Sequence, residues 1–504
     1  MRADRLALAL VVALLLAPLL VVDVPPLLDY PNHLARIYLL ANGAGDPVLA
    51  PMFTTHWGII PNLAVDIVLP PLARVLPIHV AGRLALAGLL LLNLGGVLAY
   101  HRAVFAGRSL WPLAGSLVAT GGAFMLGFLN FVAGVGAALL LAAGWIRWRD
   151  RHPRATIAGA VLGMVGLFFC HLMGLLFGLV LIGAYELDRA WTQRSWRRVA
   201  LAMLLLPAPA LFYALSPLGH AAGAGVWLGL ADKLRQLLFP FINYSLTLDT
   251  CTALAVAGFL LACAATGRLR APRHVVLALA GLAALYAVSP YAFKDTQSLD
   301  TRFTVMIALL LFAGLCPVRV PRRVIAGFLL LFALRSAVLA AAWHGHAADL
   351  AQLRAVIGGI APGTRVTVAW VSMAEAPDYW SRAPAARRLS NGIPTDTHLP
   401  ALLMIEQHAF WPLLFDESTQ QPVLLRPDDQ RLADQAGGQT DHRALAARPP
   451  AQSGLCGYDA LLLLDAGGEA DLHGFAADRL ELLAATDMAA LFRVRTGQVC
   501  PAGG

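Results

Sequence analysis

Long apolar runs recur along the chain up to about residue 343 and are separated by short polar connections. Each run is close to the roughly 20 residues that an α-helix needs to cross the hydrocarbon core of a bilayer. The runs lie near 6–22, 80–100, 111–128, 130–146, 155–170, 172–188, 199–215, 248–266, 274–289, 303–316 and 323–343. This pattern predicts a polytopic α-helical membrane protein with about 11 transmembrane helices.

The polar connections between the runs alternate in charge. Arg2 and Arg5 precede the first run, and arginine-rich segments follow the second, fourth, sixth, eighth and tenth runs. Positively charged loops remain on the cytoplasmic side of a membrane, so we expect a cytoplasmic N-terminus. An odd number of spans then places the C-terminal region outside. The first run resembles a signal peptide but has no A-x-A-like cleavage site before Asp23, and we expect it to be retained as a helix.

The hydropathy pattern changes after Trp343. Residues 345–504 contain short strand-like runs, "TRVTVAWV" and "DALLLLD", between helical or Gly/Pro-rich pieces. We therefore expect a transmembrane domain over 1–344, with a large first external loop at 23–79, and a small extracytoplasmic α/β domain over 345–504. Cys456 and Cys500 lie in this second part, where an oxidising compartment would allow them to form a disulfide.

Composition agrees with a membrane protein and narrows its partners. Hydrophobic residues make up 58% of the 504 residues and charged residues 13%, with a formal net charge of +8. Nearly all the positive charge is arginine, a bias typical of GC-rich bacterial genomes, so we expect the bacterial inner (cytoplasmic) membrane. The basic residues cluster in short loops and form no basic stripe with interleaved aromatics, which favours membrane lipids as partners and excludes nucleic acid. The oligomeric state is left open.

One external segment, "DYPNHLAR", carries three ionisable groups directly after the first run. A helix that starts near Asp29 places Asp29, His33 and Arg36 at i, i+4 and i+7, on one face. Asp29 is a suitable N-cap, and the following apolar residues favour an amphipathic helix that rests on the membrane surface. These residues are either a cap with surface His and Arg side chains or part of a functional site.

Further polar residues fall on the same predicted face of the membrane. Asp66 follows in the first external loop, His56 stands beside Trp57, and His171 interrupts a strongly apolar stretch. Several basic and acidic residues lie close together near the last external connection, among them Lys294, Asp300 and Arg302, and such a cluster could bind an anion. In the C-terminal part, His398, Glu406, His408 and Trp411 match no metal-binding spacing, and we interpret them as ordinary helix and loop residues.

The order of these features resembles the GT-C superfamily of integral membrane glycosyltransferases, which includes protein mannosyltransferases and lipid A aminoarabinose transferases. In that family a first span leads into a large external loop with a D-E-x-x-Y-type helix, a K-P-P-L-like segment and an A-x-R-L-type start of the second span. The corresponding pieces here are "LLDYPNHLARIYLLAN", "IPNLAVDIVLPPLARVLP" and "HVAGRLALAGLLLLNLGGVLAYHRAVFAGR". Tyr30 stands at the second acidic position, and the lysine of the K-P-P-L-like segment is absent.

The resemblance implies inverting transfer of a sugar from a polyprenyl-phosphate-linked donor to an extracytoplasmic lipid, glycan or protein, with Asp29 as the base or a metal-linked acid. A base and a cationic clamp suffice for this chemistry. Asp66 would then serve as a second acid, and the two carboxylates could bind Mg²⁺ or Mn²⁺. Candidates to bind the departing phosphate are Arg36, Lys294 and Arg302; His33, His56, His171 and Asp300 are further substrate-binding candidates.

Two other functions remain open at this point. A transporter or flippase for a lipid-linked substrate would carry polar groups near the bilayer midplane, whereas the predicted midplane positions here are mostly Leu, Ala, Val and Gly. A non-catalytic scaffold of GT-C-like architecture would keep the layout without activity. Sugar transfer from a polyprenyl donor distinguishes the scaffold from the enzyme.

Overall fold

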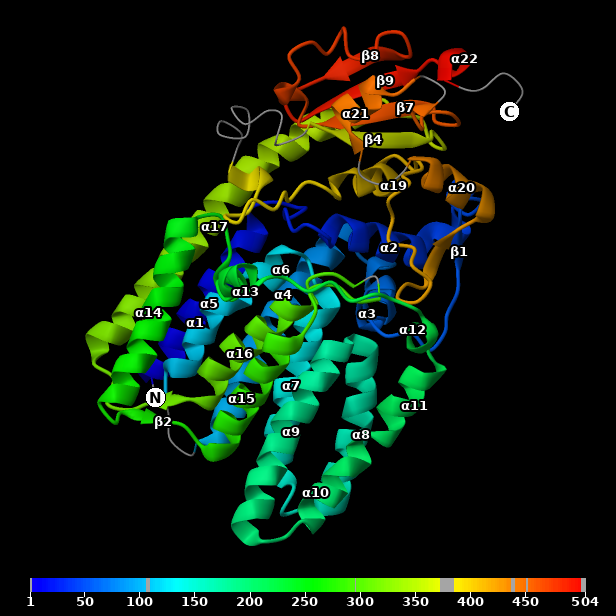
Figure 1. Cartoon of the computed structure of the whole chain (residues 1–504). Coiled ribbons are helices and arrows are strands. Elements are labelled where there is room, and N and C mark those ends of the chain that lie inside the picture. Colours follow the sequence, from blue (N-terminus) through cyan, green and yellow to red (C-terminus); the bar gives the residue numbers. More distant parts are fainter. Residues whose placement is uncertain are drawn as a thin grey trace.

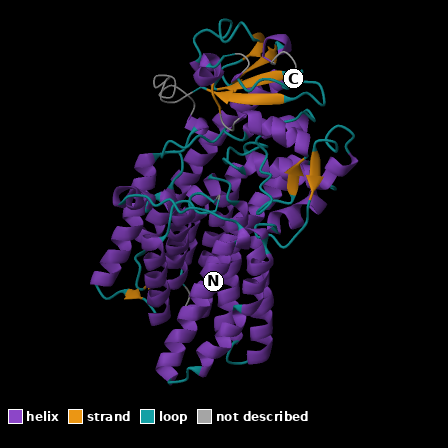
Figure 2. Cartoon of the chain, turned by 45° about the vertical axis from the view of Figure 1, so that its right-hand side comes forward, coloured by secondary structure: helices purple, strands orange, loops and turns teal. Residues whose placement is uncertain are grey.

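The computed structural model describes residues 2–105, 109–294, 296–371, 385–436, 440–449 and 452–499. Long helices form a bundle, and the C-terminal strands gather beyond one end of it (Figure 1, Figure 2). Between the bundle and the strands lies a layer of short helices and loops that includes α2 (Tyr30–Asn42) and α19 (Leu402–Glu406). This middle layer holds the candidate site.

Every predicted apolar run except one coincides with a helix or a broken helix of the bundle. They are α1 (Arg2–Leu16) with η1 (Ala17–Leu20), α4 (Ile78–Val104), α7 (Leu129–Trp148), α8 (Pro153–Cys170), α9 (Leu172–Gln193), α10 (Arg197–Ala202) with η4 (Met203–Leu205) and α11 (Pro207–Leu215), α14 (Leu246–Ala265), α15 (Arg273–Val288), α16 (Leu299–Gly314) and α17 (Arg322–Ile357). Within the described residues, 6 helical segments are long and apolar enough to cross a membrane. The total of about 11 spans stays a prediction.

The run 111–128 is not the continuous helix that its apolarity predicts. It forms three short pieces, η3 (Trp111–Gly115), α5 (Ser116–Ala119) and α6 (Gly122–Met125). The break falls at Gly121, where a Cβ atom would overlap the carbonyl oxygen of Pro240. The segment is buried almost throughout, so neighbouring protein takes the place of lipid around its irregular backbone.

The C-terminal part contains a 5-stranded sheet in the order β6-β4-β7-β9-β8. The strands are β4 (Val366–Trp370), β6 (Thr440–Asp441), β7 (Ala460–Leu464), β8 (Leu480–Ala485) and β9 (Ala489–Val494). β4 and β7 lie parallel at the positions of the two strand-like runs, and β9 is antiparallel to both β7 and β8. Helices α20 (Pro427–Ala436), α21 (His442–Ala447) and α22 (Thr496–Val499) and the turns η6 (Ala385–Arg387) and η9 (Ala466–Gly468) connect or follow them.

The predicted domain boundary at 344/345 falls inside a helix. α17 continues to Ile357, and one hydrophobic core extends from Val11 in the bundle to Leu491 in the sheet. The division into two domains therefore stays a prediction. The expected partner of Cys456, Cys500, lies outside the described residues.

The first external loop and the C-terminal part are joined directly. β1 (Phe53–Thr55) pairs antiparallel with β5 (Val423–Leu425), and η7 (Leu399–Ala401) and α19 pack on α2. α3 (Ala64–Ala73) packs against the other side of α2. α2 was expected to rest on the membrane surface, but this packing buries it between two parts of the protein.

The remaining short elements lie in the connections between bundle helices. α12 (Pro217–His220), α13 (Leu230–Gln236) and η5 (Phe239–Phe241) connect α11 to α14, and η2 (Gly43–Gly45) follows α2. At the opposite end of the bundle, β2 (Leu269–Arg270) pairs with β3 (Cys316–Pro317) (Figure 1).

Candidate active site

Asp29 occupies the N-cap position of α2, as the sequence predicts, but its side chain makes no capping hydrogen bond. The helix start is instead held by its backbone, because the Asp29 amide donates to the Leu126 carbonyl oxygen at 3.1 Å. Gly127 permits this close approach: its φ is +74°, and a Cβ there would lie 2.8 Å from the Tyr30 nitrogen. The Asp29 carboxylate is thus left for other contacts.

A cavity of about 760 Å³ opens beside Asp29, which is the size of a small-molecule site. One wall comes from the bundle, including Phe128, Phe131, His171 and Arg302, and the opposite wall from C-terminal residues 393–398 and 414–421. The predicted site residues Asp29, His33, His171 and Arg302 all line it. Residues far apart in the sequence therefore meet in one space at the end of the bundle that faces the C-terminal sheet.

The carboxylate of Asp29 lies next to His398. The Asp29 Oδ1 and His398 Nδ1 atoms are 3.2 Å apart, an ion-pair distance without the alignment of a hydrogen bond. The imidazole is held by edge contacts with Phe415 and Trp411, with ring centroids at 4.9 and 6.2 Å. The sequence interpretation of His398 as an ordinary loop residue missed this contact, because no spacing pattern connects it to Asp29.

Arg302 supplies a cation to the cavity. It lies in the first turn of α16, and its guanidinium carbon is 4.8 Å from the Phe128 ring centroid and 5.9 Å from that of Phe131. The residue is only 7% exposed, and its Nε and Nη1 atoms have no hydrogen-bond partner among the described residues. A buried arginine with unused donors is suited to bind an anionic group such as a phosphate.

His33 is held from behind by a buried ion pair. The Arg36 Nη2 and His33 Nδ1 atoms are 3.0 Å apart, and Arg36 donates to both carboxylate oxygens of Asp66, at 2.6 and 3.1 Å. Burial, with the positive charge of Arg36 and the nearby His398, holds the pKa of His33 well below its usual value. His33 is therefore a neutral imidazole at pH 7 and contributes hydrogen-bonding groups rather than charge.

Asp66 and Arg36 pair with each other, and their predicted roles in catalysis and phosphate binding stay predictions. Both side chains are buried, and neither lines the cavity. The Asp66 carboxylate is engaged by Arg36, and the metal site expected at Asp29 and Asp66 stays a prediction. Within the described residues, no group of three or more His, Cys, Asp and Glu side chains is arranged to hold a metal.

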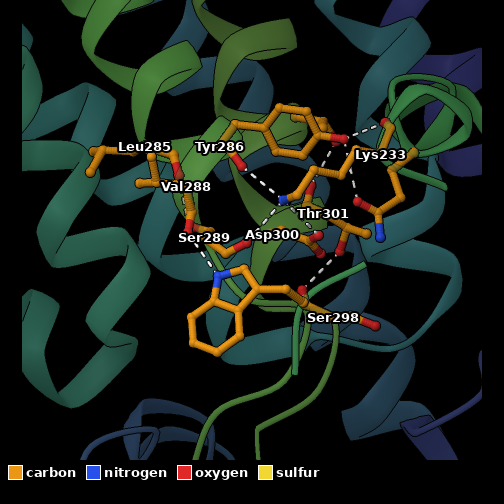
Figure 3. Close-up of polar contacts among 11 residues, drawn as sticks. Lys233, Leu285, Tyr286, Val288, Ser289, Ser298, Asp300 and Thr301 are labelled. Carbon is orange, nitrogen blue, oxygen red and sulfur yellow. Dashed lines mark hydrogen bonds and ion pairs between the residues drawn. The ribbon is translucent and has the colours of Figure 1, made fainter. Parts of the chain in front are cut away.

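Asp300 also lies outside the cavity, in a network at the start of α16 (Figure 3). Its Oδ2 atom is 3.3 Å from the Lys233 Nζ, which also donates to the carbonyl oxygens of Tyr286 and Ser289 at 3.0 and 2.9 Å. Lys233 lies 4.9 Å from the Tyr286 ring centroid. Asp300 thus joins α16 to α13, and Lys233 joins α13 to the end of α15; the substrate contact of Asp300 stays a prediction.

Two other predicted substrate-binding residues have local partners. Lys294 donates to the Leu218 carbonyl oxygen at 3.1 Å and to the Tyr213 hydroxyl at 3.3 Å. His56 is exposed, and its backbone amide donates to the Pro422 carbonyl oxygen at 2.7 Å beside the β1–β5 pair. Neither side chain lines the cavity, although Tyr291 and residues 296–298 of the loop that carries Lys294 do.

His171 and Asn130 shape the bundle wall of the cavity. The Nδ1 of His171 accepts from the Met173 amide at 3.0 Å and so caps α9, while its ring meets the edge of Phe131 at 5.4 Å. The Asn130 side chain accepts from the Val65 amide at 3.0 Å and donates to the Asn62 carbonyl oxygen. These contacts tie the first external loop to α7 and keep the wall in place.

The C-terminal wall is fixed to α2 by one amide side chain. Asn32 donates to the Leu413 carbonyl oxygen and accepts from the Phe415 amide, both at 2.9 Å. This places Phe415 against His33, with ring centroids 5.7 Å apart, and brings Asp416 into the lining. Burial raises the pKa of Asp416. Asp416 and Asn32 were missed in the sequence because neither belongs to a periodic or motif pattern.

The chain has a helical bundle with a broken buried segment, an acidic residue directly before α2, and a cavity between the bundle and C-terminal residues of the range 393–421, and its fold is that of the GT-C class of membrane protein. The particular likeness is to ArnT from Cupriavidus metallidurans. Its crystal structure bound to undecaprenyl phosphate is similar at 14% sequence identity and a TM-score of 0.54, with 99% of this chain and 99% of that chain covered. The apo structure of the same protein gives 14% identity and a TM-score of 0.50, over 99% and 98%.

No family model matches the sequence, and no curated protein matches it. The likeness to ArnT is therefore one of fold, and it confirms the predicted resemblance to the GT-C superfamily at that level. With the apolar helices, it identifies the chain as a multi-pass membrane protein.

Proposed function

We propose that the chain is a membrane glycosyltransferase that moves a sugar from a polyprenyl-phosphate-linked donor to an extracytoplasmic acceptor, which is a lipid, a glycan or a protein. The observation that carries the proposal is that Asp29 lies in one cavity with the buried Arg302, whose Nε and Nη1 atoms have no hydrogen-bond partner among the described residues. A carboxylate and a cation in one partly dry space are what transfer from a phosphate leaving group requires. The undecaprenyl phosphate bound by ArnT supports the lipid-linked donor.

The reaction follows from these two groups. Asp29 accepts the proton of the acceptor hydroxyl, whose oxygen attacks the anomeric carbon with inversion. The bond between that carbon and the donor phosphate oxygen breaks, and the oxygen retains the electron pair. Arg302 stabilises the charge that develops on the departing polyprenyl phosphate. Neutral His33 and the amide groups of Gln420 and Gln421, which also line the cavity, are suited to bind sugar hydroxyls.

The position of the cavity favours an enzyme over a transporter. It opens at the end of the bundle that faces the C-terminal sheet, and Asp29 and His33 lie in the external loop rather than in a bundle helix. A conduit would carry such groups near the bilayer midplane. We further propose the bacterial inner membrane as the location, with the cavity and the C-terminal part on the extracytoplasmic side and the N-terminus in the cytoplasm.

Metal dependence stays a prediction. Asp29 with Mg²⁺ or Mn²⁺ would activate the acceptor as a metal-linked acid, but the predicted second ligand, Asp66, pairs with Arg36. Transfer measured in the presence of EDTA and after addition of either ion separates metal-linked catalysis from a carboxylate base that acts alone.

The test is substitution of Asp29. We expect Asp29→Asn to lower sugar transfer from a panel of undecaprenyl-phosphate sugars by about 10²–10⁴-fold, because the amide cannot accept the hydroxyl proton. Asp428→Asn is the matched control, since the Asp428 carboxylate is 82% exposed on α20. Both variants should keep the wild-type melting temperature in detergent.

Two outcomes would contradict the proposal. Unchanged transfer by folded Asp29→Asn protein would remove Asp29 from the mechanism. Absence of transfer by the wild type with every donor, together with retained binding of undecaprenyl phosphate, would favour the non-catalytic scaffold.

A further inference from the structure

A second cavity of about 600 Å³ lies near the opposite end of the bundle from Asp29. It is bounded by α1, α14, the start of α17 and the first turns of the broken segment, near the β2–β3 pair (Figure 1). None of its lining residues takes part in the candidate active site. Its volume falls in the range of ligand-binding pockets.

The walls of this cavity are mainly apolar and aromatic. Trp111 lies 5.4 Å from Phe259 and 5.8 Å from Phe328, measured between ring centroids, and these two phenylalanines are 5.4 Å apart. The Trp111 indole nitrogen donates to the Leu311 carbonyl oxygen at 3.1 Å, so its polar atom is already satisfied. The aromatic faces are therefore available to an apolar chain.

The mouth of the cavity is basic. Arg270 on β2 and Arg319 after β3 are exposed and line it, and no ion pair joins either one to an acidic side chain of the described residues. The two connections that carry them, 266–274 and 316–323, contain no Asp or Glu and hold further exposed arginines, including Arg268 and Arg322. An anionic group at this mouth would meet uncompensated positive charge.

The outer surfaces of the helices that bound this cavity, α1, α14 and α17, carry exposed apolar side chains. Leu10 on α1 is 46% exposed, Leu261 on α14 is 70% exposed and Leu330 on α17 is 71% exposed. Such side chains would contact lipid in a membrane-spanning bundle, which places the helices around the cavity beside acyl chains. An apolar pocket between helices with arginines at its rim is a recurrent form of anionic lipid site.

We infer that this second cavity binds one anionic glycerophospholipid, with an acyl chain against Trp111, Phe259 and Phe328 and its phosphate on Arg270 and Arg319. The inference does not depend on the proposed glycosyltransferase activity. A zwitterionic lipid has a cationic head group beside its phosphate and would gain less from the two arginines.

The test uses quenching of Trp111 fluorescence by lipids with brominated acyl chains. The full-length protein in detergent is titrated with brominated phosphatidylglycerol or brominated phosphatidylcholine, and the Trp111 component is the difference between the wild type and Trp111→Phe. We expect phosphatidylglycerol to reach half of its quenching at a roughly 10-fold lower lipid concentration than phosphatidylcholine.

The substitution Arg270→Gln with Arg319→Gln should abolish this preference for phosphatidylglycerol. Arg151→Gln with Arg154→Gln is the matched control, because it removes the same charge from an exposed connection that does not line the cavity, and it should leave the preference intact. Ala114→Phe, which fills the cavity, should abolish the quenching itself. Melting temperatures verify that each variant is folded.

Equal quenching by both lipids in the wild type would overturn the inference. So would a preference for phosphatidylglycerol that survives Arg270→Gln with Arg319→Gln. Quenching that persists in folded Ala114→Phe would place the acyl chain on the outer surface of the bundle, and would equally contradict a lipid inside the cavity.

Discussion

At the scale of the residue, the Asp29 side chain makes no capping hydrogen bond to its own helix. An N-cap aspartate usually accepts a hydrogen bond from the first turn of its helix, but here the carboxylate lies beside His398, on the cavity that also contains Arg302. Tyr30, at the position of a second acid in the family, is buried against Gly82, where a Cβ atom would overlap its hydroxyl. Asp29 therefore lines the cavity without an acidic neighbour at the next position.

His398 is expected to act as a positioning residue for Asp29. Removal of the imidazole in His398→Phe should lower kcat about 10–100-fold, because the carboxylate loses the group beside it. His398→Gln, whose amide can donate a hydrogen bond, should recover much of this loss. The effects of His398→Phe and Asp29→Asn should also be non-additive: in the Asp29→Asn background, where there is no carboxylate to orient, His398→Phe should lower kcat little further.

The measurement is steady-state transfer with each single and double variant. Equal losses in His398→Phe and His398→Gln, or a His398→Phe effect that persists in full in the Asp29→Asn background, would show that the imidazole only supports the fold of the wall.

At the scale of the element, the broken segment 111–128 is what places Asp29. Its end at Leu126 and Gly127 receives the start of α2, and its beginning at Trp111 is fixed to α16 near the other end of the bundle. In a regular helix the amide four residues later would donate to the carbonyl oxygen of Leu126, whereas in this broken segment that oxygen accepts from the Asp29 amide. The apolarity of residues 111–128 correctly predicts that the segment lies in the bundle. It does not predict the irregular backbone, which packs closely on η5 at Gly121 and Gly122.

Gly121→Ala should therefore destabilise the protein by about 1–3 kcal/mol, because the added methyl group meets the Pro240 carbonyl oxygen. Gly159→Ala is the control: a Cβ at Gly159 on α8 has nothing within 4 Å, and the change should be neutral or slightly stabilising. Thermal unfolding in detergent measures both. Equal melting temperatures for the two variants would contradict the close approach of η5 to the segment.

At the scale of the whole molecule, the cavity exists only because the C-terminal part is fixed to the bundle. The Asp249 carboxylate on α14 pairs with Arg335 on α17 at 2.7 Å and accepts from the Ser390 hydroxyl at 2.6 Å. With the Asn32 contacts, this buried link joins α14 and α17 of the bundle, α2 and the segment that carries His398. Breaking a buried ion pair costs about 3–5 kcal/mol, so the arrangement is firmly held.

The proposed orientation predicts which loops can be labelled from outside the cell membrane. In a background without the free cysteines Cys170, Cys251, Cys263 and Cys316, Ser418→Cys, at an exposed position next to the cavity-lining Glu417, should react with a membrane-impermeant maleimide in intact spheroplasts. Gln193→Cys, equally exposed at the end of α9, should react only after the membrane is opened. The reverse labelling pattern would invert the topology and place the cavity in the cytoplasm.

The sequence by itself determined the membrane class, the positions of nearly all bundle helices, the two central strands and the helix that begins at Asp29, because hydrophobic periodicity and capping are local properties. The sequence also predicted that His33 and Arg36 lie on one helix face, because residues three or four apart are neighbours on a helix surface. Only the tertiary structure decided that Arg36 pairs with Asp66, that Asp300 pairs with Lys233, and that His398 meets Asp29. Contacts between single polar side chains far apart in the chain leave no periodic pattern, and they arise only when the packing of the apolar core brings their backbones together.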